Sequence, residues 1–169
     1  MSDVTIRLAA TADLPRLHPI IERAYRGESA RAGWTHEADL LDGTRTDIAT
    51  LEALVANPRE RLLMASDGDA PIGCVQVSDR GDGIAYLGLL CVEPTLQAAG
   101  LGKRLIAAAE RLARESFGAA TIEMTVIENR AELIAYYERR GYVRTPERRE
   151  LPIDVTPPLY MTVLVKSLG

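Results

Sequence analysis

A run of glycines and small residues at positions 97–104 is the segment whose residue types and spacing point most directly to chemistry. It reads Gln-Ala-Ala-Gly-Leu-Gly-Lys-Arg and follows an apolar stretch that ends at Pro94. Small residues let a ligand approach the backbone closely, and the first N–H groups of a helix are unpaired donors at the positive end of its dipole. Lys103 and Arg104 add positive charge. The segment therefore predicts an anion site suited to a pyrophosphate.

Two common phosphate-binding loops do not fit this segment. A Walker A loop requires Ser or Thr directly after its lysine, whereas Arg104 follows Lys103 here. A dinucleotide-binding fingerprint requires a third glycine three residues after the second, and Leu105 occupies that position. A nucleotide triphosphatase and a Rossmann-type cofactor site are therefore both disfavoured.

The remaining pattern is Gln-x-x-Gly-x-Gly at the start of a helix, after a strand and a Val-Glu-Pro turn. It closely resembles the acetyl-CoA signature of the GNAT superfamily of acyl-CoA-dependent N-acyltransferases, and the resemblance extends from about Ile72 to Tyr142. It implies that acetyl-CoA enters between the strands at 84–92 and 121–127, with its pantetheine arm along the first strand and its pyrophosphate on the loop. The cofactor-binding residues that it implies are Leu90, Cys91, Val92, Gln97, Ala98, Ala99, Gly100, Leu101, Gly102, Lys103 and Asn129.

Acetyl transfer from a thioester to an amine needs a base for the amine, donors for the oxyanion and an acid for the departing thiolate. The segment Ala-Tyr-Tyr-Glu-Arg-Arg-Gly-Tyr at 135–142 resembles the family helix that carries the general acid, which implies that role for Tyr137. Helical periodicity places the neighbouring Tyr136 on a different face. Glu123 is a candidate base, acting directly or through a water, and Glu93 is a weaker one. The structural alternatives are a core tyrosine and a solvent-facing glutamate.

The sequence departs from the family pattern between the strand and the helix of this region. The interval from Glu123 to Tyr137 is longer than in the simplest family members, and Arg130 directly follows Asn129. Arg130 could therefore replace or supplement the asparagine contact with the cofactor.

The acceptor side in this family is usually built from the loop after the first helix and from the C-terminal region. That loop contains the candidate substrate-binding residues Trp34, His36 and Glu37. Trp34 could provide an apolar wall, and Glu37 could attract a cationic amine. Alternatively, Trp34 anchors the loop to the core and His36 is an ordinary surface histidine.

Hydrophobic periodicity and turn residues predict the elements that position these groups. Strands are expected at 4–8, 61–66, 72–78, 84–92, 121–127 and 160–165, and helices at 11–27, 46–57, 100–117 and 131–140. The segment 145–158 has the composition of a linker. This order predicts an α/β fold in one domain, residues 1–169, with a mixed sheet covered by helices on both faces. The resemblance adds that the sheet is splayed and mostly antiparallel.

Bulk composition limits the partners. The chain is 47% hydrophobic and 26% charged and lacks a secretory signal or an apolar run long enough to cross a bilayer, so we expect a cytoplasmic protein without a membrane partner. Its net charge of −4 disfavours nucleic-acid binding. Cys74 and Cys91 lack a metal-binding spacing and are expected to be packed thiols. Five arginines at 139–149 are interleaved with glutamates, which favours a solvated, salt-bridged face over an anion-binding patch.

Together these features predict an N-acetyltransferase that moves the acetyl group of acetyl-CoA to a primary amine of a small molecule or peptide, without a metal. The alternative is a CoA-responsive binding module that lacks catalysis. The sequence leaves open the acceptor, the size of the acyl group, and whether the chain is a monomer or a homodimer.

Overall fold

A central sheet organises the protein. The computed structural model describes residues 4–25, 46–93, 100–150 and 158–169. Within them, seven strands form one sheet in the order β1-β2-β3-β4-β5-β7-β6. The strands are β1 (Val4–Leu8), β2 (Glu60–Asp67), β3 (Ala70–Gly81), β4 (Ile84–Val92), β5 (Thr121–Ile127), β6 (Val143–Glu150) and β7 (Tyr160–Ser167). All neighbouring strands pair antiparallel except β4 and β5, which pair parallel.

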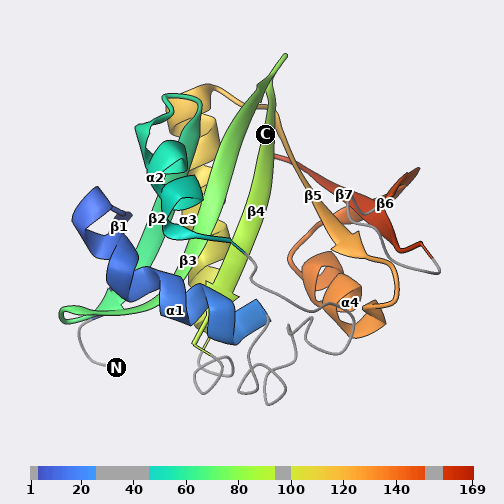
Figure 1. Ribbon diagram of the computed structural model, residues 1–169. Coiled ribbons are helices and arrows are strands. Elements are labelled where there is room, and N and C mark those ends of the chain that lie inside the picture. Colours follow the sequence, from blue (N-terminus) through green and yellow to red (C-terminus); the bar gives the residue numbers. More distant parts are fainter. Residues whose placement is uncertain (1–3, 26–45, 94–99, 151–157) are drawn as a thin grey trace.

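Helices cover both faces of this sheet. The helices are α1 (Leu14–Tyr25), preceded by a 3-10 turn at Thr11–Asp13, α2 (Ile48–Ala56), α3 (Leu101–Phe117) and α4 (Ala131–Arg139). Cys74 of β3 belongs to the core cluster under α1 and α2, whereas its neighbour Val75 belongs to the cluster under α3 and α4. Successive strand residues therefore point to opposite cores, as the pleat requires. Figure 1 shows α1 and α2 in front of the sheet and α3 behind it. The predicted mixed, mostly antiparallel sheet with two-sided helical cover is confirmed.

α3 follows from the sequence in a simple way. Its buried residues recur at helical spacing and are Leu101, Leu105, Ile106, Ala109 and Ala113. Lys103 and Arg104 lie on the exposed side of the helix. The helix ends at Gly118, whose φ of 62° is the left-handed conformation that commonly terminates helices. This amphipathic pattern fixes how the start of α3 sits against β4.

β4 and β5 diverge, which opens the sheet at its centre. Their pairing covers Ile84–Tyr86 against Thr121–Glu123. β5 then pairs with β7 over its whole length, from Thr121 to Ile127. Figure 1 shows β4 and β5 starting together and running apart toward α4. The two strands share no ladder beyond these residues. We call the unpaired region between the second half of β4 and the second half of β5 the opening.

The expectation of a linker at 145–158 is wrong for residues 145–150, which belong to the strand β6, and residues 151–157 lie outside the described ones. Val143–Glu150 forms an edge strand antiparallel to β7, and most of its residues are exposed. Its sequence carries charges and Pro146 in place of an alternating apolar pattern. Such residues are tolerated at a sheet edge, where one side of the strand needs no partner. An exposed edge strand therefore gave no hydrophobic signal to detect.

Candidate active site

A β-bulge interrupts β4 where it leaves β5. Cys74 of β3 lies opposite Cys91, and Gln76 lies opposite Gly88, so two steps along β3 correspond to three along β4. The extra residue falls at Leu89, whose φ of 51° lies in the left-handed region. An extra residue of this kind bends a strand and disrupts the ladder locally.

The bulge reverses which face of the sheet the following side chains of β4 point to. Leu87 packs in the cluster under α3, whereas Leu89 packs in the cluster under α1 and α2, although strict alternation would place both on one face. A left-handed conformation costs a branched residue about 1–3 kcal/mol. Burial compensates for this cost, because Leu89 is only 6% exposed. A leucine with positive φ has no sequence signal, so this bend was not located from the sequence.

Beyond the bulge, the side chains of β4 pack into one or the other of the two hydrophobic cores. Cys91 packs under α1, Val92 packs under α3, and Leu90 is partly buried against the α3 cluster. Glu93 is held by Arg23 of α1, whose guanidinium contacts both carboxylate oxygens. This stretch therefore presents mainly backbone toward the opening.

The first turn of α3 has the features of an anion-binding cradle. Gly100 is its N-cap with a φ of 79°, and a Cβ at this position would meet no atom of the described residues within 4 Å. The first backbone hydrogen bond of the helix runs from the Arg104 N–H to the Gly100 carbonyl oxygen, with N and O 3.3 Å apart. The N–H groups of Leu101, Gly102 and Lys103 therefore have no acceptor inside the helix. This turn contains no acidic residue. An open approach and aligned donors fit the pyrophosphate of acetyl-CoA.

Tyr137 lies in an aromatic cluster on the inner side of α4. It is 6% exposed, and its ring meets the ring of Tyr142 edge-on with centroids 6.2 Å apart. The Tyr142 hydroxyl donates to Glu110 of α3 at 2.9 Å, and Lys166 of β7 donates to both oxygens of that carboxylate. Burial and the Glu110 carboxylate raise the pKa of Tyr142 above its ordinary value. Tyr142 therefore stays a neutral hydrogen-bond donor. The hydrogen bonds of Tyr142 and Lys166 to Glu110 fix the Tyr142 ring, against which the Tyr137 ring packs.

Tyr136 is positioned differently from its neighbour. Its hydroxyl lies beside Gly102 of α3, where a Cβ would come within 3.0 Å of the phenolic oxygen. The guanidinium of Arg140 lies 5.0 Å from its ring centroid, and the Tyr137 ring meets it edge-on at 5.4 Å. The sequence predicted that Tyr136 points away from the face of Tyr137. The structure adds that it points to the start of α3, a contact that depends on helix packing.

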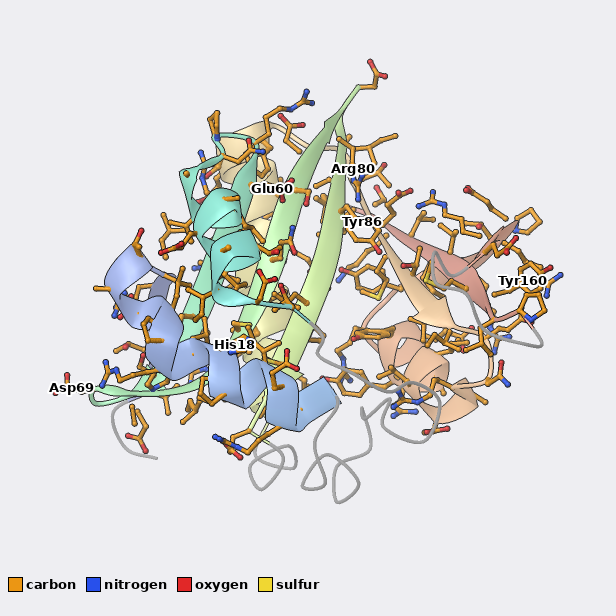
Figure 2. All side chains as sticks on the ribbon, viewed as in Figure 1. His18, Glu60, Asp69, Arg80, Tyr86 and Tyr160 are labelled. Carbon is orange, nitrogen blue, oxygen red and sulfur yellow. The ribbon has the colours of Figure 1, made fainter. Side chains whose placement is uncertain are left out.

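Glu123, the candidate base, lies on the face of β5 opposite the α3 core. It is mostly buried, with its side chain 16% exposed, and Arg149 of β6 contacts its Oε1 at 3.3 Å. Thr125 lies two residues along on the same face, and its hydroxyl is 2.5 Å from the hydroxyl of Tyr86 on β4. Figure 2 shows Tyr86 beside Arg80, whose guanidinium lies 4.5 Å from the ring centroid. Polar groups thus connect β4 and β5 where the strands begin to separate.

Sequence reasoning missed a second set of polar residues on this face. Glu60 of β2 accepts hydrogen bonds from Gln76 at 2.8 Å and from the Ser78 hydroxyl at 2.5 Å. By strand alternation these side chains share the face of Tyr86 and Glu123. We call this set, Glu60, Gln76, Ser78, Tyr86, Glu123 and Thr125, the polar strip. Polar residues at every second position of otherwise apolar strands were the signal that could have located it.

The other predicted site residues fall into two groups. Asn129 is exposed in the turn between β5 and α4, and Arg130 is buried at the N-cap of α4 with 7% exposure. The remaining predicted residues lie outside the described ones and are Trp34, His36, Glu37, Gln97, Ala98 and Ala99.

Several predictions about the rest of the molecule can be compared with the structure. Cys74 and Cys91 are both buried free thiols, with sulfur atoms 3.4 Å apart. The arginines near the C-terminal strands form ion pairs, namely Arg144 with Glu138, Arg148 with Glu128, and Arg149 with Glu123 and Glu147. Among the described residues, no group of three His, Cys, Asp or Glu side chains could hold a metal. No helix in this part of the chain is long and apolar enough to span a membrane.

Comparisons with known proteins agree with this geometry. The model of the acetyltransferase (GNAT) family matches residues 15–142. The yncA protein of Salmonella typhimurium, an assigned acetyltransferase solved with its cofactor acetyl-CoA, superimposes with a TM-score of 0.75 at 20% identity over 99% of this chain and 95% of that one. The ribosomal-protein-S18-alanine N-acetyltransferase of Escherichia coli gives 0.74 at 20% identity over 98% and 94%. A spermidine N-acetyltransferase chimera from Vibrio cholerae and hSSAT gives 0.74 at 16% identity over 98% and 96%. No curated protein sequence matches the chain.

Proposed function

The chain belongs to the GNAT acetyltransferase family, and from this premise we propose that it transfers the acetyl group of acetyl-CoA to a primary amine of a small molecule or peptide. The observation that carries the proposal is the opening between β4 and β5. The bulge at Leu89 and the cradle at the start of α3 both lie at the β4 side of this opening.

The β4 side of the opening would hold the cofactor. The backbone of Leu90, Cys91 and Val92 would align the pantetheine arm, and the N–H groups of Leu101–Lys103 would hold the pyrophosphate. When bound, acetyl-CoA supplies an activated thioester. A backbone N–H at the bulge would donate to the carbonyl oxygen that gains negative charge. Because the bulge is braced by two cores, this donor would be held in place before the reaction begins.

Tyr137 would donate the proton that the departing thiolate needs. Its ring is fixed between Tyr136 and Tyr142, and Tyr142 is fixed in turn by Glu110. A phenol is a suitable acid for a thiolate because it is neutral at physiological pH and donates through a single oxygen. The buried ring therefore supports a positioned general acid.

Glu123 would accept the proton of the amine, directly or through a water. Arg149 contacts its Oε1, so we assign proton acceptance to Oε2. Tyr86 lies opposite Glu123 in the sheet, and Thr125 bonds to Tyr86 on the same face. The polar strip continues across β3 to Glu60 of β2, whose carboxylate adds a second negative charge to this face. A cationic amine fits these groups better than an anionic acceptor does. The names of the spermidine and S18-alanine acetyltransferases support an amine acceptor of either a polyamine or a peptide type.

A thiol-release assay tests this proposal. Purified protein is incubated with acetyl-CoA and a panel containing spermidine, free amino acids, a peptide with an N-terminal alanine and a lysine peptide, and products are identified by mass spectrometry. We expect amine-dependent thiol release with a matching acetylated product. Binding of acetyl-CoA without release across a broad panel would favour the CoA-responsive module, and failure to bind would contradict the cofactor assignment.

Tyr137→Phe separates catalysis from binding in the same assay. The variant keeps the buried ring but loses the acid, so turnover should fall by about 10²- to 10⁴-fold while CoA affinity is retained. Unchanged turnover would assign the proton to another group.

A further inference from the structure

Tyr136 and Tyr137 are adjacent on α4, yet the structure gives them different surroundings. Successive residues of an α-helix point about 100° apart around its axis. Tyr137 accordingly enters the core beside Tyr142, whereas Tyr136 is only partly buried and directs its hydroxyl to Gly102 of α3. Two hydroxyls held in these directions do not serve the same atom of one ligand.

The neighbour of the Tyr136 hydroxyl is the cradle at the start of α3. Gly102 is the second residue of that helix, and its N–H is among the donors without an intrahelical acceptor. A Cβ at Gly102 would lie 3.0 Å from the phenolic oxygen, which is closer than most Cβ contacts in proteins. The absence of a side chain at this position therefore lets the hydroxyl reach the cradle.

The ring of Tyr136 is held in this position from two sides. Its centroid lies 5.4 Å from that of Tyr137, and Arg140 covers the ring with its guanidinium 5.0 Å from the centroid. The Arg140 carbonyl also accepts from Lys166 at 2.9 Å, which ties the end of α4 to β7. A tyrosine with an anchored apolar ring and a hydroxyl at the edge of the core is suited to binding a polar ligand group.

We propose that the Tyr136 hydroxyl donates a hydrogen bond to the pyrophosphate of acetyl-CoA and thereby sets cofactor affinity, while Tyr137 serves the chemical step. This inference rests on the proposed function, because that function places the pyrophosphate on α3. The cofactor is then held from two helices, by backbone N–H groups of α3 and by a side chain of α4. The guanidinium of Arg140 adds positive charge on the same side.

Calorimetric titration with CoA and with dephospho-CoA tests the proposal. Dephospho-CoA retains the pyrophosphate but lacks the 3′-phosphate. Loss of a hydrogen bond to a charged group corresponds to about 10- to 100-fold in affinity, so Tyr136→Phe should weaken both ligands by a similar factor in this range. The KM for acetyl-CoA should rise by a similar factor, with a smaller change in kcat. Tyr137→Phe is the matched control, because it removes a hydroxyl from the next residue and should leave both affinities unchanged.

Gly102→Ala provides an independent route to the same contact. The new methyl group would displace the Tyr136 hydroxyl, so this variant alone should also weaken CoA binding. In the Tyr136→Phe background the methyl group meets no hydroxyl, so the second substitution should add little. This non-additivity is expected only if both changes act on one contact.

Three outcomes would overturn the assignment. Equal affinity of Tyr136→Phe and the wild type for both ligands would leave Tyr136 a purely structural residue. If Tyr136→Phe lowers the affinity for CoA but not for dephospho-CoA, the hydroxyl contacts the 3′-phosphate and not the pyrophosphate. Additive effects of Gly102→Ala and Tyr136→Phe on CoA affinity would show that the two substitutions do not act on one contact. Thermal melting of each variant identifies a folding defect, and failure of the wild type to bind CoA would instead contradict the proposed function.

Discussion

Gly73→Ala should disturb the cofactor strand from its neighbour in the sheet. Gly73 of β3 lies opposite Val92, the last residue of β4. A Cβ at Gly73 would lie 2.7 Å from the carbonyl oxygen of Cys91 and 3.2 Å from a methyl group of Leu105. The first distance is shorter than Cβ atoms tolerate, and its partner is backbone, so β3 or β4 must shift. The end of β4 leads to the α3 cradle, so the shift should reach the cofactor site.

The size of the effect follows from this overlap. Overpacking of a well-packed core costs about 1–3 kcal/mol. A domain of this size loses about 2–4 °C in Tm per kcal/mol, so Gly73→Ala should melt about 2–12 °C below the wild type. CoA affinity should fall in parallel, because the displaced carbonyl belongs to Cys91.

Gly88→Ala is the matched control for this experiment. It makes the same substitution on β4, but its Cβ would meet the ring of Tyr86 at 3.2 Å and Gln76 Oε1 at 3.9 Å. Both neighbours are side chains, which adjust more easily than backbone, so its Tm should fall less than that of Gly73→Ala. Thermal and denaturant unfolding measure both variants. If Gly73→Ala is as stable as the wild type, the close approach of β3 to β4 described above is wrong.

Three further predictions concern stability and reactivity. Arg7 contacts both oxygens of Asp13 and lowers the pKa of that carboxyl to about 2 from 3.8. Because the folded pKa is depressed, the ionised Asp13 should stabilise the fold at neutral pH, and this contribution should disappear as pH falls from about 4 to 2. The stability gap between wild type and Asp13→Asn, from urea unfolding, should therefore close over that range; a constant gap would refute the ion pair as its cause. Lys166→Met leaves the mostly buried carboxylate of Glu110 without its cation and should cost about 2–3 kcal/mol, part of which Glu110→Gln should restore in the double variant; simple additivity would argue against the pair. The two buried cysteine thiols should react with a disulfide reagent only after denaturation, and rapid reaction of the native protein would contradict their burial.

Much of the fold was predictable because its signals are local. The strand at Ile84–Val92 has the predicted bounds, since turn residues precede it and Pro94 follows it. The spacing of apolar residues likewise predicted a helix at 100–117, and α3 spans Leu101–Phe117. These features depend on residues close together in sequence.

The missed features depend on contacts between distant segments. The left-handed conformation of Leu89 is held by two cores that form only in the folded sheet. The contact of Tyr136 with Gly102 joins α4 to α3. Glu60 meets Ser78 only because β2 pairs with β3 in a particular register. Local pattern does not specify any of these contacts, although each bears on the proposed site.

Hydrogen exchange with and without acetyl-CoA tests the central claim most directly, namely that the cofactor binds in the opening between β4 and β5. Bound acetyl-CoA should slow exchange at the backbone amides of 89–92 and 101–103, and in α4 around Tyr136. β1, at the far edge of the sheet, should change little and serves as the internal reference. Protection at these three segments would support the site. Protection elsewhere, or none at saturating acetyl-CoA, would contradict it.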